Sequence, residues 1–442
     1  MFHDISSMPN QQFIISEIEK LLIEVANNEL YFVLEFDNHF VHNTAGIPSL
    51  KSFLSDVGNM IMSNSDISKW CLGIDIANEV NIYTGSNYKS NVCDNIASVD
   101  EIVGEIKSSN PDILVTTSTY KISSLFSYWH LLETQIDYYS AHLYPRKQNN
   151  YNPSYAINEL FWLSKHCSMP FMIQETGFST HPNDGSSGGW GSYADQKSFH
   201  ENMLQNTLNS GSIGYLWWQY MDIDWGMTNN NRFHGLYDLS GAPKPITTAF
   251  NISSAYSFAT ISQPQSYYTY NQDQQGSYFT VTLSDCSGMS LTSAVVRFDD
   301  LTHSTKTFVD EYGTATVVFN GTPTQILASA PGYESTLILP LKNTYHYNIC
   351  LNKLSCSSQA SSGLQSNKME SESISSVYQS RDSQKLIIPN KWQNITIYNN
   401  LGQVMYKNIS PTSQETTINI STWPKGVYIV LADSHISKIV LR

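Results

Sequence analysis

Two glutamates stand where apolar strands end, and they could serve one reaction. WCLGIDIANEVN places Glu79 after an apolar run, and FMIQETG places Glu175 in the same way. Catalytic groups of parallel barrels and open sheets lie at the carboxyl ends of strands. Two carboxylates facing each other there can hydrolyse a glycoside, because one protonates the leaving oxygen while the other attacks the anomeric carbon. A lone glutamate is more often a solvated loop residue, so the pair carries this interpretation.

Four neighbouring side chains support the pair and are candidates for substrate binding. His142 and Tyr144 lie two residues apart, so both point to one side of the strand that precedes Glu175. A tyrosine hydroxyl there can hydrogen-bond the attacking carboxylate and hold it ionised. Trp217 and Trp218 end the following strand, where one indole can face the mouth as a stacking plane for sugar while the other packs outward. A pair of tryptophans more often packs in the hydrophobic core, but the nearby glutamates, His142 and Tyr144 favour a sugar-stacking role for this pair.

Further aromatic and polar residues are weaker candidates. Trp190, in the loop SSGGWGS, and Trp225 can line additional sugar subsites, which would suit a polymer, or they can pack within their loops. Asp37 and His39 follow the first strand that the sequence predicts, at 30–36, and can face a substrate cleft or serve as ordinary turn residues. The sequence leaves these alternatives open.

The elements that must position these residues alternate between strand and helix. Continuous apolar runs predict strands, and apolar residues at helical spacing predict helices between them. Ser98 and Glu101 form a capping-box signature that predicts another helix start. Apolar strands that alternate with helices indicate a parallel sheet covered by helices, either a barrel or a doubly wound sheet. The strands are expected at 30–36, 70–77, 112–118, 136–144, 171–176 and 213–220, with later helices at about 154–166 and 194–209.

Helical periodicity stops after about residue 262, and the remaining chain divides into three parts. Residues 262–354 contain short strands separated by turns, which predicts a small antiparallel sandwich. Residues 355–384 are rich in serine and predict a flexible linker, and a last set of strands fills 385–442. Cys286 and Cys350 could bridge across the small sandwich, whereas Cys71, inside a strand, is expected to be a buried free thiol.

Composition narrows the classes of partner. The chain of 442 residues has 41% hydrophobic and 14% charged residues, which is typical of a globular protein. Its net charge is −14 and it has no basic run, so nucleic acid is not expected as a partner. The cysteines show no metal-ligand spacing, and neither a metal nor a cofactor is expected. Its 27 Tyr and 9 Trp permit a carbohydrate site.

Taken together, the motifs around the two glutamates resemble clan A glycoside hydrolases, closest to the family 5-like enzymes and the endo-β-mannosidases. The resemblance implies a (β/α)8 TIM barrel over residues 1–260 and a retaining mechanism without a cofactor. It makes Glu79 the general acid/base and Glu175 the nucleophile, with Asn78 holding the 2-hydroxyl and Trp218 stacking on the sugar. The motifs are NE at 78–79, HLY at 142–144, QETG at 174–177, YLWW at 215–218 and GLYDLSGAPKP at 235–245.

The order of the strands departs from that family. There the acid/base ends strand four and the nucleophile strand seven, but here they end the second and fifth recognisable strands. The resemblance therefore implies a barrel truncated to about six strands, without strands one and two and without the arginine that strand two usually supplies. The first residues, MFHDISSMPN, lack the features of a signal peptide, so we expect the natural protein to extend upstream of Met1. Six strands cannot close a barrel.

The end of the chain carries a second resemblance. Residues 385–442, with YNNLGQ followed by KGVYIV and a basic final strand, resemble the C-terminal sorting domain of the bacterial type IX secretion system. This likeness implies contact with the secretion machinery and release from the cell or attachment to its surface. The plain alternative is a small β module that binds sugar or protein. The sandwich before it is similar to carboxypeptidase-regulatory domains and is expected to act as a spacer.

Two functions from different classes follow from the sequence. The first is a secreted, monomeric, retaining glycoside hydrolase that acts on a β-linked polysaccharide of the mannan or glucan type. The second is a non-catalytic carbohydrate-binding surface protein, or an inactive fragment of such an enzyme. The paired carboxylates favour the first function, and the missing strands favour the second.

Overall fold

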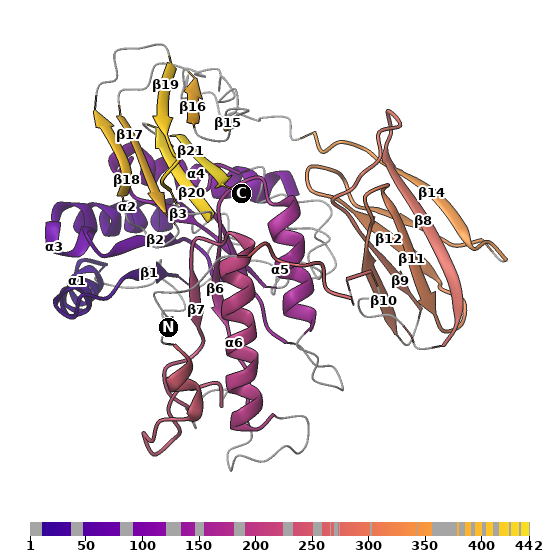
Figure 1. The fold of residues 1–442 in the computed structure, drawn as a ribbon, viewed down its shortest axis with the longest axis horizontal. Helices are drawn as coiled ribbons and strands as arrows, with labels where there is room; N and C mark the ends of the chain where they lie inside the picture. Colours follow the sequence, from indigo (N-terminus) through magenta and orange to yellow (C-terminus); the bar gives the residue numbers. More distant parts are fainter. Residues whose placement is uncertain are drawn as a thin grey trace.

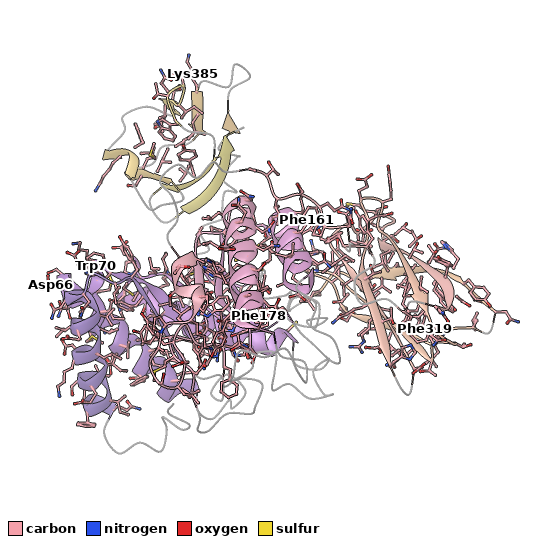
Figure 2. All side chains as sticks on the ribbon, turned by 60° about the horizontal axis from the view of Figure 1, so that its bottom comes forward. Asp66, Trp70, Phe161, Phe178, Phe319 and Lys385 are labelled. Atoms are coloured by element: carbon pink, nitrogen blue, oxygen red, sulfur yellow. A yellow bond between two sulfur atoms is a disulfide. The ribbon has the colours of Figure 1, made fainter. Side chains whose placement is uncertain are left out.

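A computed structural model of the chain has the helices and strands drawn in Figure 1. Phe178, Phe319 and Lys385 in Figure 2 mark the three regions of the chain, and each region has a hydrophobic core. The structure describes residues 11–36, 47–79, 92–120, 134–145, 154–180, 191–223, 233–250, 259–265, 267–268, 273, 275–300, 303–341, 343–355, 378–379, 385–389, 394–399, 404–409, 415–423, 426–432 and 435–441.

The first region alternates helices with parallel strands, as the sequence predicts. Its helices are α1 (Gln11–Asn27), α2 (Ile47–Ser63), α3 (Ser65–Ser68), α4 (Val92–Ser109), α5 (Ser154–His166), α6 (Tyr193–Ser210) and the short 3-10 helix η6 (Pro245–Ala249). Its strands are β1 (Phe32–Glu35), β2 (Cys71–Asp75), β3 (Val115–Thr116), β4 (Ser118–Tyr120), β5 (Tyr139–His142), β6 (Phe171–Thr176) and β7 (Tyr215–Trp217). The fold class is therefore α/β.

The strands of this region follow one another in space as they do in the chain. The orders are β1-β2-β3 and β4-β5-β6-β7, and every neighbouring pair is parallel. Only Thr117 separates β3 from β4, and the backbone N–H of Ser118 still donates to the carbonyl of Ala77 at 3.3 Å. Three steps thus lead from β2 to β6, which is the interval expected between the two glutamates.

The sheet curves so that distant strands face each other across its interior. The amide of Gln174 on β6 donates to the Glu35 carboxylate at the end of β1 at 2.9 Å. Within the described residues no ladder joins β1 to β7. The parallel α/β arrangement is confirmed, whereas the complete barrel and its truncation remain predictions.

Helices pack on this sheet through apolar side chains at helical spacing. In α2 the buried residues Leu50, Phe53, Leu54, Val57 and Ile61 recur at intervals of three and four, so one face of the helix enters the core. No helix in the described residues is long and apolar enough to cross a membrane.

The second region consists of two sheets that share one core. Its strands are β8 (Ser277–Asp285), β9 (Val295–Asp299), β10 (Ser304–Phe308), β11 (Thr314–Phe319), β12 (Gln325–Ser329), β13 (Thr336–Ile338) and β14 (His346–Leu351). The orders are β10-β9-β12-β13 and β11-β8-β14. A disulfide joins Cys286 to Cys350. Cys71 is a free thiol as expected, but it is half-buried rather than buried. The expectation of a wholly antiparallel unit is wrong in one place, because β14 pairs with β8 in parallel.

The third region also has two sheets around a small apolar core. Its strands are β15 (Tyr378–Gln379), β16 (Lys385–Pro389), β17 (Asn394–Asn399), β18 (Val404–Ile409), β19 (Glu415–Asn419), β20 (Gly426–Ala432) and β21 (His435–Leu441). The orders are β15-β16-β19 and β18-β17-β20-β21. The short strand β15 falls within residues 355–384, the predicted linker, and most of that linker lies outside the described residues.

Candidate active site

Neighbouring strands and one connecting segment bring the two predicted glutamates together. Glu175 lies on β6 and pairs in register with His142, the last residue of β5. Glu79 follows β2 by four residues, and its backbone N–H donates to the Ser118 hydroxyl at 3.0 Å. Glu79 has a left-handed φ of 44°. Side chains with a Cβ seldom adopt this conformation, which clusters at functional sites.

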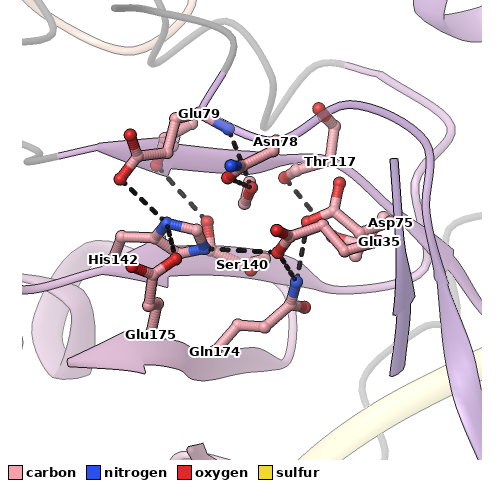
Figure 3. A network of polar contacts seen from close by, with 12 residues as sticks. Glu35, Asp75, Asn78, Glu79, Thr117, Ser140, His142, Gln174 and Glu175 are labelled. Carbon is pink, nitrogen blue, oxygen red and sulfur yellow. Dashed lines mark hydrogen bonds and ion pairs between the residues drawn. The ribbon is translucent and has the colours of Figure 1, made fainter. Parts of the chain in front are cut away.

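His142 contacts both glutamates with the same nitrogen (Figure 3). Its Nδ1 lies 3.0 Å from Glu79 Oε1 and 3.1 Å from Glu175 Oε2. The two carboxylate oxygens are consequently no more than roughly 6 Å apart, and retaining glycosidases hold their two carboxyl groups at about 5 to 5.5 Å. The sequence grouped these residues correctly, although it assigned His142 only to substrate binding.

The charge of His142 follows from its surroundings. Burial alone lowers the pKa of this imidazole, but the Glu175 and Glu79 carboxylates raise it, and the net pKa is about 9. His142 is therefore an imidazolium ion at neutral pH. It is fully buried, so little water screens its attraction to the carboxylates.

Tyr144 makes the contact with Glu175 that the sequence predicts. Its hydroxyl donates to Glu175 Oε1. Burial and the nearby Glu175 charge raise the pKa of Tyr144 well above its ordinary value, so the hydroxyl keeps its proton. Burial also raises the pKa of Glu175 to about 7, although His142 and the Tyr144 hydrogen bond act in the opposite direction.

A second polar cluster lies beside the glutamate pair and was not foreseen as part of the site. Glu35 and Asp75 occupy paired positions on β1 and β2. The Gln174 side-chain nitrogen donates to Glu35 Oε2 at 2.9 Å and to Asp75 Oδ2 at 2.8 Å. Asp75 is fully buried, and burial, together with the Glu35 charge, raises its pKa to about 7. The available signal was Asp75 itself, a charged residue inside an otherwise apolar strand.

The two tryptophans after Glu175 differ in their contacts. The Trp217 indole N–H donates to the carbonyl of His234 at 2.9 Å, and its ring packs against Phe199 and His200 on α6. Trp217 and Trp218 both line a cavity of about 240 Å³ that also contacts Glu175. Because Trp217 is held by α6, Trp218 is the better candidate for a stacking surface.

Other predicted residues have a less direct place. Asn78 is half-buried, and its side-chain oxygen accepts a hydrogen bond from the Ser118 hydroxyl at 3.4 Å. The contact of Asn78 with a sugar 2-hydroxyl stays a prediction. Trp190 lies outside the described residues, as do Asp37, His39 and Trp225.

One group of side chains within the described residues has the composition of a metal site. Ligand atoms of Glu35, His142 and Glu175 lie within 4.8 Å of one another. A protonated imidazole has no lone pair to offer a metal. The ion-paired state of His142 and metal ligation are therefore mutually exclusive, and an imidazolium contacting two carboxylates fits the observed distances.

Comparison with known proteins identifies the third region. Residues 380–442 match the protein family described as the secretion system C-terminal sorting domain. The protein is accordingly a type IX secretion substrate that is released or held at the cell surface. No curated protein matches the chain.

Solved structures similar to this chain are glycoside hydrolases. A GH5_18 protein from Streptomyces cattleya, in complex with Manb1-4GlcNAc, is 12% identical over 56% of this chain and 68% of its own, with a TM-score of 0.45. The GH53 catalytic domain from Ignisphaera aggregans is 14% identical over 54% of this chain and 78% of its own, with a TM-score of 0.43. Bifidobacterium dentium β-glucuronidase is 16% identical over 49% of this chain and 34% of its own, with a TM-score of 0.38.

Proposed function

We propose that the protein is a secreted retaining glycoside hydrolase that cleaves a β-linked polysaccharide of the mannan or glucan type. The observation that carries this proposal is the contact of Glu79 and Glu175 with one imidazole nitrogen of His142. It limits the separation of the two carboxylate oxygens to roughly 6 Å, which suits double displacement better than direct attack by water. The sorting domain supports a substrate found outside the cell.

The proposed reaction has two steps. In the first, a Glu175 oxygen bonds to the anomeric carbon while the glycosidic bond breaks and Glu79 gives its proton to the leaving oxygen. In the second, water attacks the same carbon, passes a proton to Glu79 and releases Glu175. Both carboxyl groups return to their starting states, and the anomeric configuration is retained.

Two neighbours support the charge changes of Glu175. His142 supplies a positive charge 3.1 Å from Oε2, and the Tyr144 hydroxyl donates to Oε1. Both contacts favour the ionised nucleophile against burial, which favours its protonated form. His142 also lies 3.0 Å from Glu79, so the same imidazole contacts both active-site carboxyl groups.

The cavity beside Glu175 is suited to one sugar ring. Its volume of about 240 Å³ lies below the roughly 300 to 1,000 Å³ of sites for drug-sized ligands. Trp218 lines it together with Glu175, and indole rings provide flat apolar surfaces that match the faces of sugars. We assign Trp218 the stacking role on this basis.

Two variants, one without the proposed nucleophile and one without the proposed general acid/base, would test this function. β-Mannan, glucomannan and mixed-linkage β-glucan are incubated with wild type, Glu175→Ala and Glu79→Ala, with exposed Glu105→Ala of α4 as the control. Each active-site variant should lose at least about 10³-fold in kcat. Azide should restore turnover of an activated substrate in both, giving an inverted glycosyl azide with Glu175→Ala and a retained one with Glu79→Ala.

The products decide between the functions. Full activity in either variant would remove that glutamate from its role. Binding of a polysaccharide by wild type without any hydrolysis would instead favour the non-catalytic carbohydrate-binding protein.

A further inference from the structure

Glu35 is the most accessible carboxylate of the active-site cluster. Its side chain is 31% exposed, whereas those of Glu79 and Glu175 are each 15% exposed. Glu35 lines the same cavity as Glu175 and Trp218, although it lies on β1, at the opposite end of the strand order. Carboxylate oxygens of Glu35 and Glu175 lie within 4.8 Å of each other, so a ligand in this cavity can contact both residues.

The Glu35 carboxylate is held in place by the interior of the sheet. Gln174 donates to its Oε2 at 2.9 Å and also to buried Asp75, so one amide links Glu35 to a fully buried side chain of β2 (Figure 3). The Nε2 atom of fully buried His142 lies 3.9 Å from the same oxygen. Groups fixed in this way bind a ligand with little further loss of conformational freedom.

The described charges around the cavity are unbalanced. The reaction proposed above requires a protonated Glu79, and burial favours a protonated Asp75. Besides these two, Glu35 and Glu175 place two more carboxyl groups at the cavity, and both lie near the single basic side chain of the described cluster, His142. A carboxylate on the sugar would add a further acidic group to this cluster, whereas hydroxyl groups can donate hydrogen bonds to Glu35.

We propose that Glu35 is a specificity-determining residue that accepts hydrogen bonds from the hydroxyls of a neutral sugar ring and rejects the corresponding uronate. This inference rests on the proposed function, because it takes the cavity beside Glu175 as the place of a sugar ring. It goes further because it names the substrate class, neutral hexose polymers without a uronic acid at this position, and attributes that selectivity to one side chain.

Equilibrium binding tests the proposal without requiring turnover. Isothermal titration calorimetry is carried out on protein carrying Glu79→Ala, in which the proposed proton donor is absent and the probes are not consumed. The probes are cellopentaose and mannopentaose, and the same oligosaccharides oxidised at C6 to uronates. With Glu35 intact, this protein should bind at least one neutral probe about tenfold or more tightly than its oxidised form, because like charges in a shared site are costly. Glu35→Gln should weaken the neutral probe by about 10- to 100-fold, because a hydrogen bond to a charged group is lost, and should narrow the discrimination.

Matched variants separate this role from a structural one. Glu35→Asp keeps the charge but retracts it, so discrimination against the oxidised probe should persist while neutral binding weakens. Glu105→Gln, on an exposed position of α4, should change neither. Circular dichroism and thermal unfolding check that Glu35→Gln remains folded.

The outcomes for the two proposals are distinguishable. With Glu35 intact, equal affinity for neutral and oxidised probes or no binding of either would overturn the role of Glu35, as would unchanged affinities in folded Glu35→Gln. If any of these results is found but wild type hydrolyses a polysaccharide in a reaction that depends on Glu175, the glycosidase function stands and the specificity role of Glu35 is rejected. If binding prefers neutral probes and needs Glu35 but wild type hydrolyses nothing, the specificity role stands and the glycosidase function is rejected.

Discussion

The imidazole of His142 and the carboxylate of Glu175 lie 3.1 Å apart, on neighbouring strands whose register pairs the two residues directly. This pairing makes the charge of His142 part of the environment of the proposed nucleophile. Burial and charge oppose each other at both residues: burial disfavours either charged form, while each ion favours the other. The cation therefore offsets part of the cost that burial imposes on the ionised carboxylate.

Replacing His142 tests that dependence. His142→Asn should lower kcat/KM by about 10²- to 10³-fold, because a preorganised charge at the reacting carboxylates is lost. The same change should move the acidic limb of the pH profile to higher pH, since without the cation the pKa of Glu175 rises further. Exposed His346→Asn is the matched control. A reduced rate with an unmoved acidic limb would indicate a merely structural role for His142.

The wild-type pH dependence follows from the same pKa values. The nucleophile must be ionised, and the pKa of Glu175 is about 7, so kcat/KM should rise as the pH increases through about 7. His142 loses its proton near pH 9, which removes the cation between the carboxylates, so activity should fall above that pH. Initial rates between pH 5 and 10 measure both limbs. Maximal activity at pH 5 would contradict the assignment of Glu175 as the ionised nucleophile.

The sequence predicts those parts of the fold whose signals are local. Residues 154–166 and 171–176 are predicted as a helix and a strand, and α5 and β6 have these bounds, because each follows the period of its element. The helix start at Ser98 is wrong: α4 begins at Val92, and Ser98 lies within it. A capping-box pattern of two residues can also occur inside a helix, and only the backbone before it decides.

The site is predictable only where one residue type suffices to indicate chemistry. Glu79 and Glu175 are recognisable because each follows an apolar strand. Glu35 and Asp75 belong to the site because both accept hydrogen bonds from Gln174, which lies on β6, far from them in the sequence. No local pattern encodes this contact, because the curvature of the sheet creates it.

Stability should also depend on pH through this cluster. The pKa values of Asp75 and Glu175 rise from 3.8 and 4.5 to about 7 on folding, so the folded protein holds protons that the unfolded chain has released between those values. The contribution of His142 is complete below its unfolded pKa of 6.5 and is lost as the pH rises through about 9. All three groups therefore favour the folded state at lower pH.

Thermal unfolding measures this effect. The melting temperature of the first region should be higher at pH 5 than at pH 9, with each group contributing on the order of 3 kcal/mol at most. Asp75→Asn cannot ionise, so its pH dependence between 5 and 7 should be shallower than that of wild type. Equal slopes in the two proteins would show that Asp75 titrates in the same way in the folded and unfolded states.

A buried ion pair holds the segment that follows β7. Lys244 Nζ lies 2.7 Å from Asp222 Oδ1, both side chains are almost fully buried, and Lys244 also donates to the Thr180 hydroxyl after β6. Lys244→Met should lower the free energy of unfolding by about 3 to 5 kcal/mol, because it leaves the Asp222 carboxylate buried without its partner. Urea denaturation measures the loss, with exposed Lys353→Met as the control.

The double variant Lys244→Met with Asp222→Asn distinguishes the cause. Removing both charges leaves no unpaired ion, so the double variant should be more stable than Lys244→Met alone. If the two destabilising effects simply added, the ion pair would not be the source of the loss, and the packing of the lysine chain against the Tyr193 ring, whose centroid lies 5.1 Å from Nζ, would account for it.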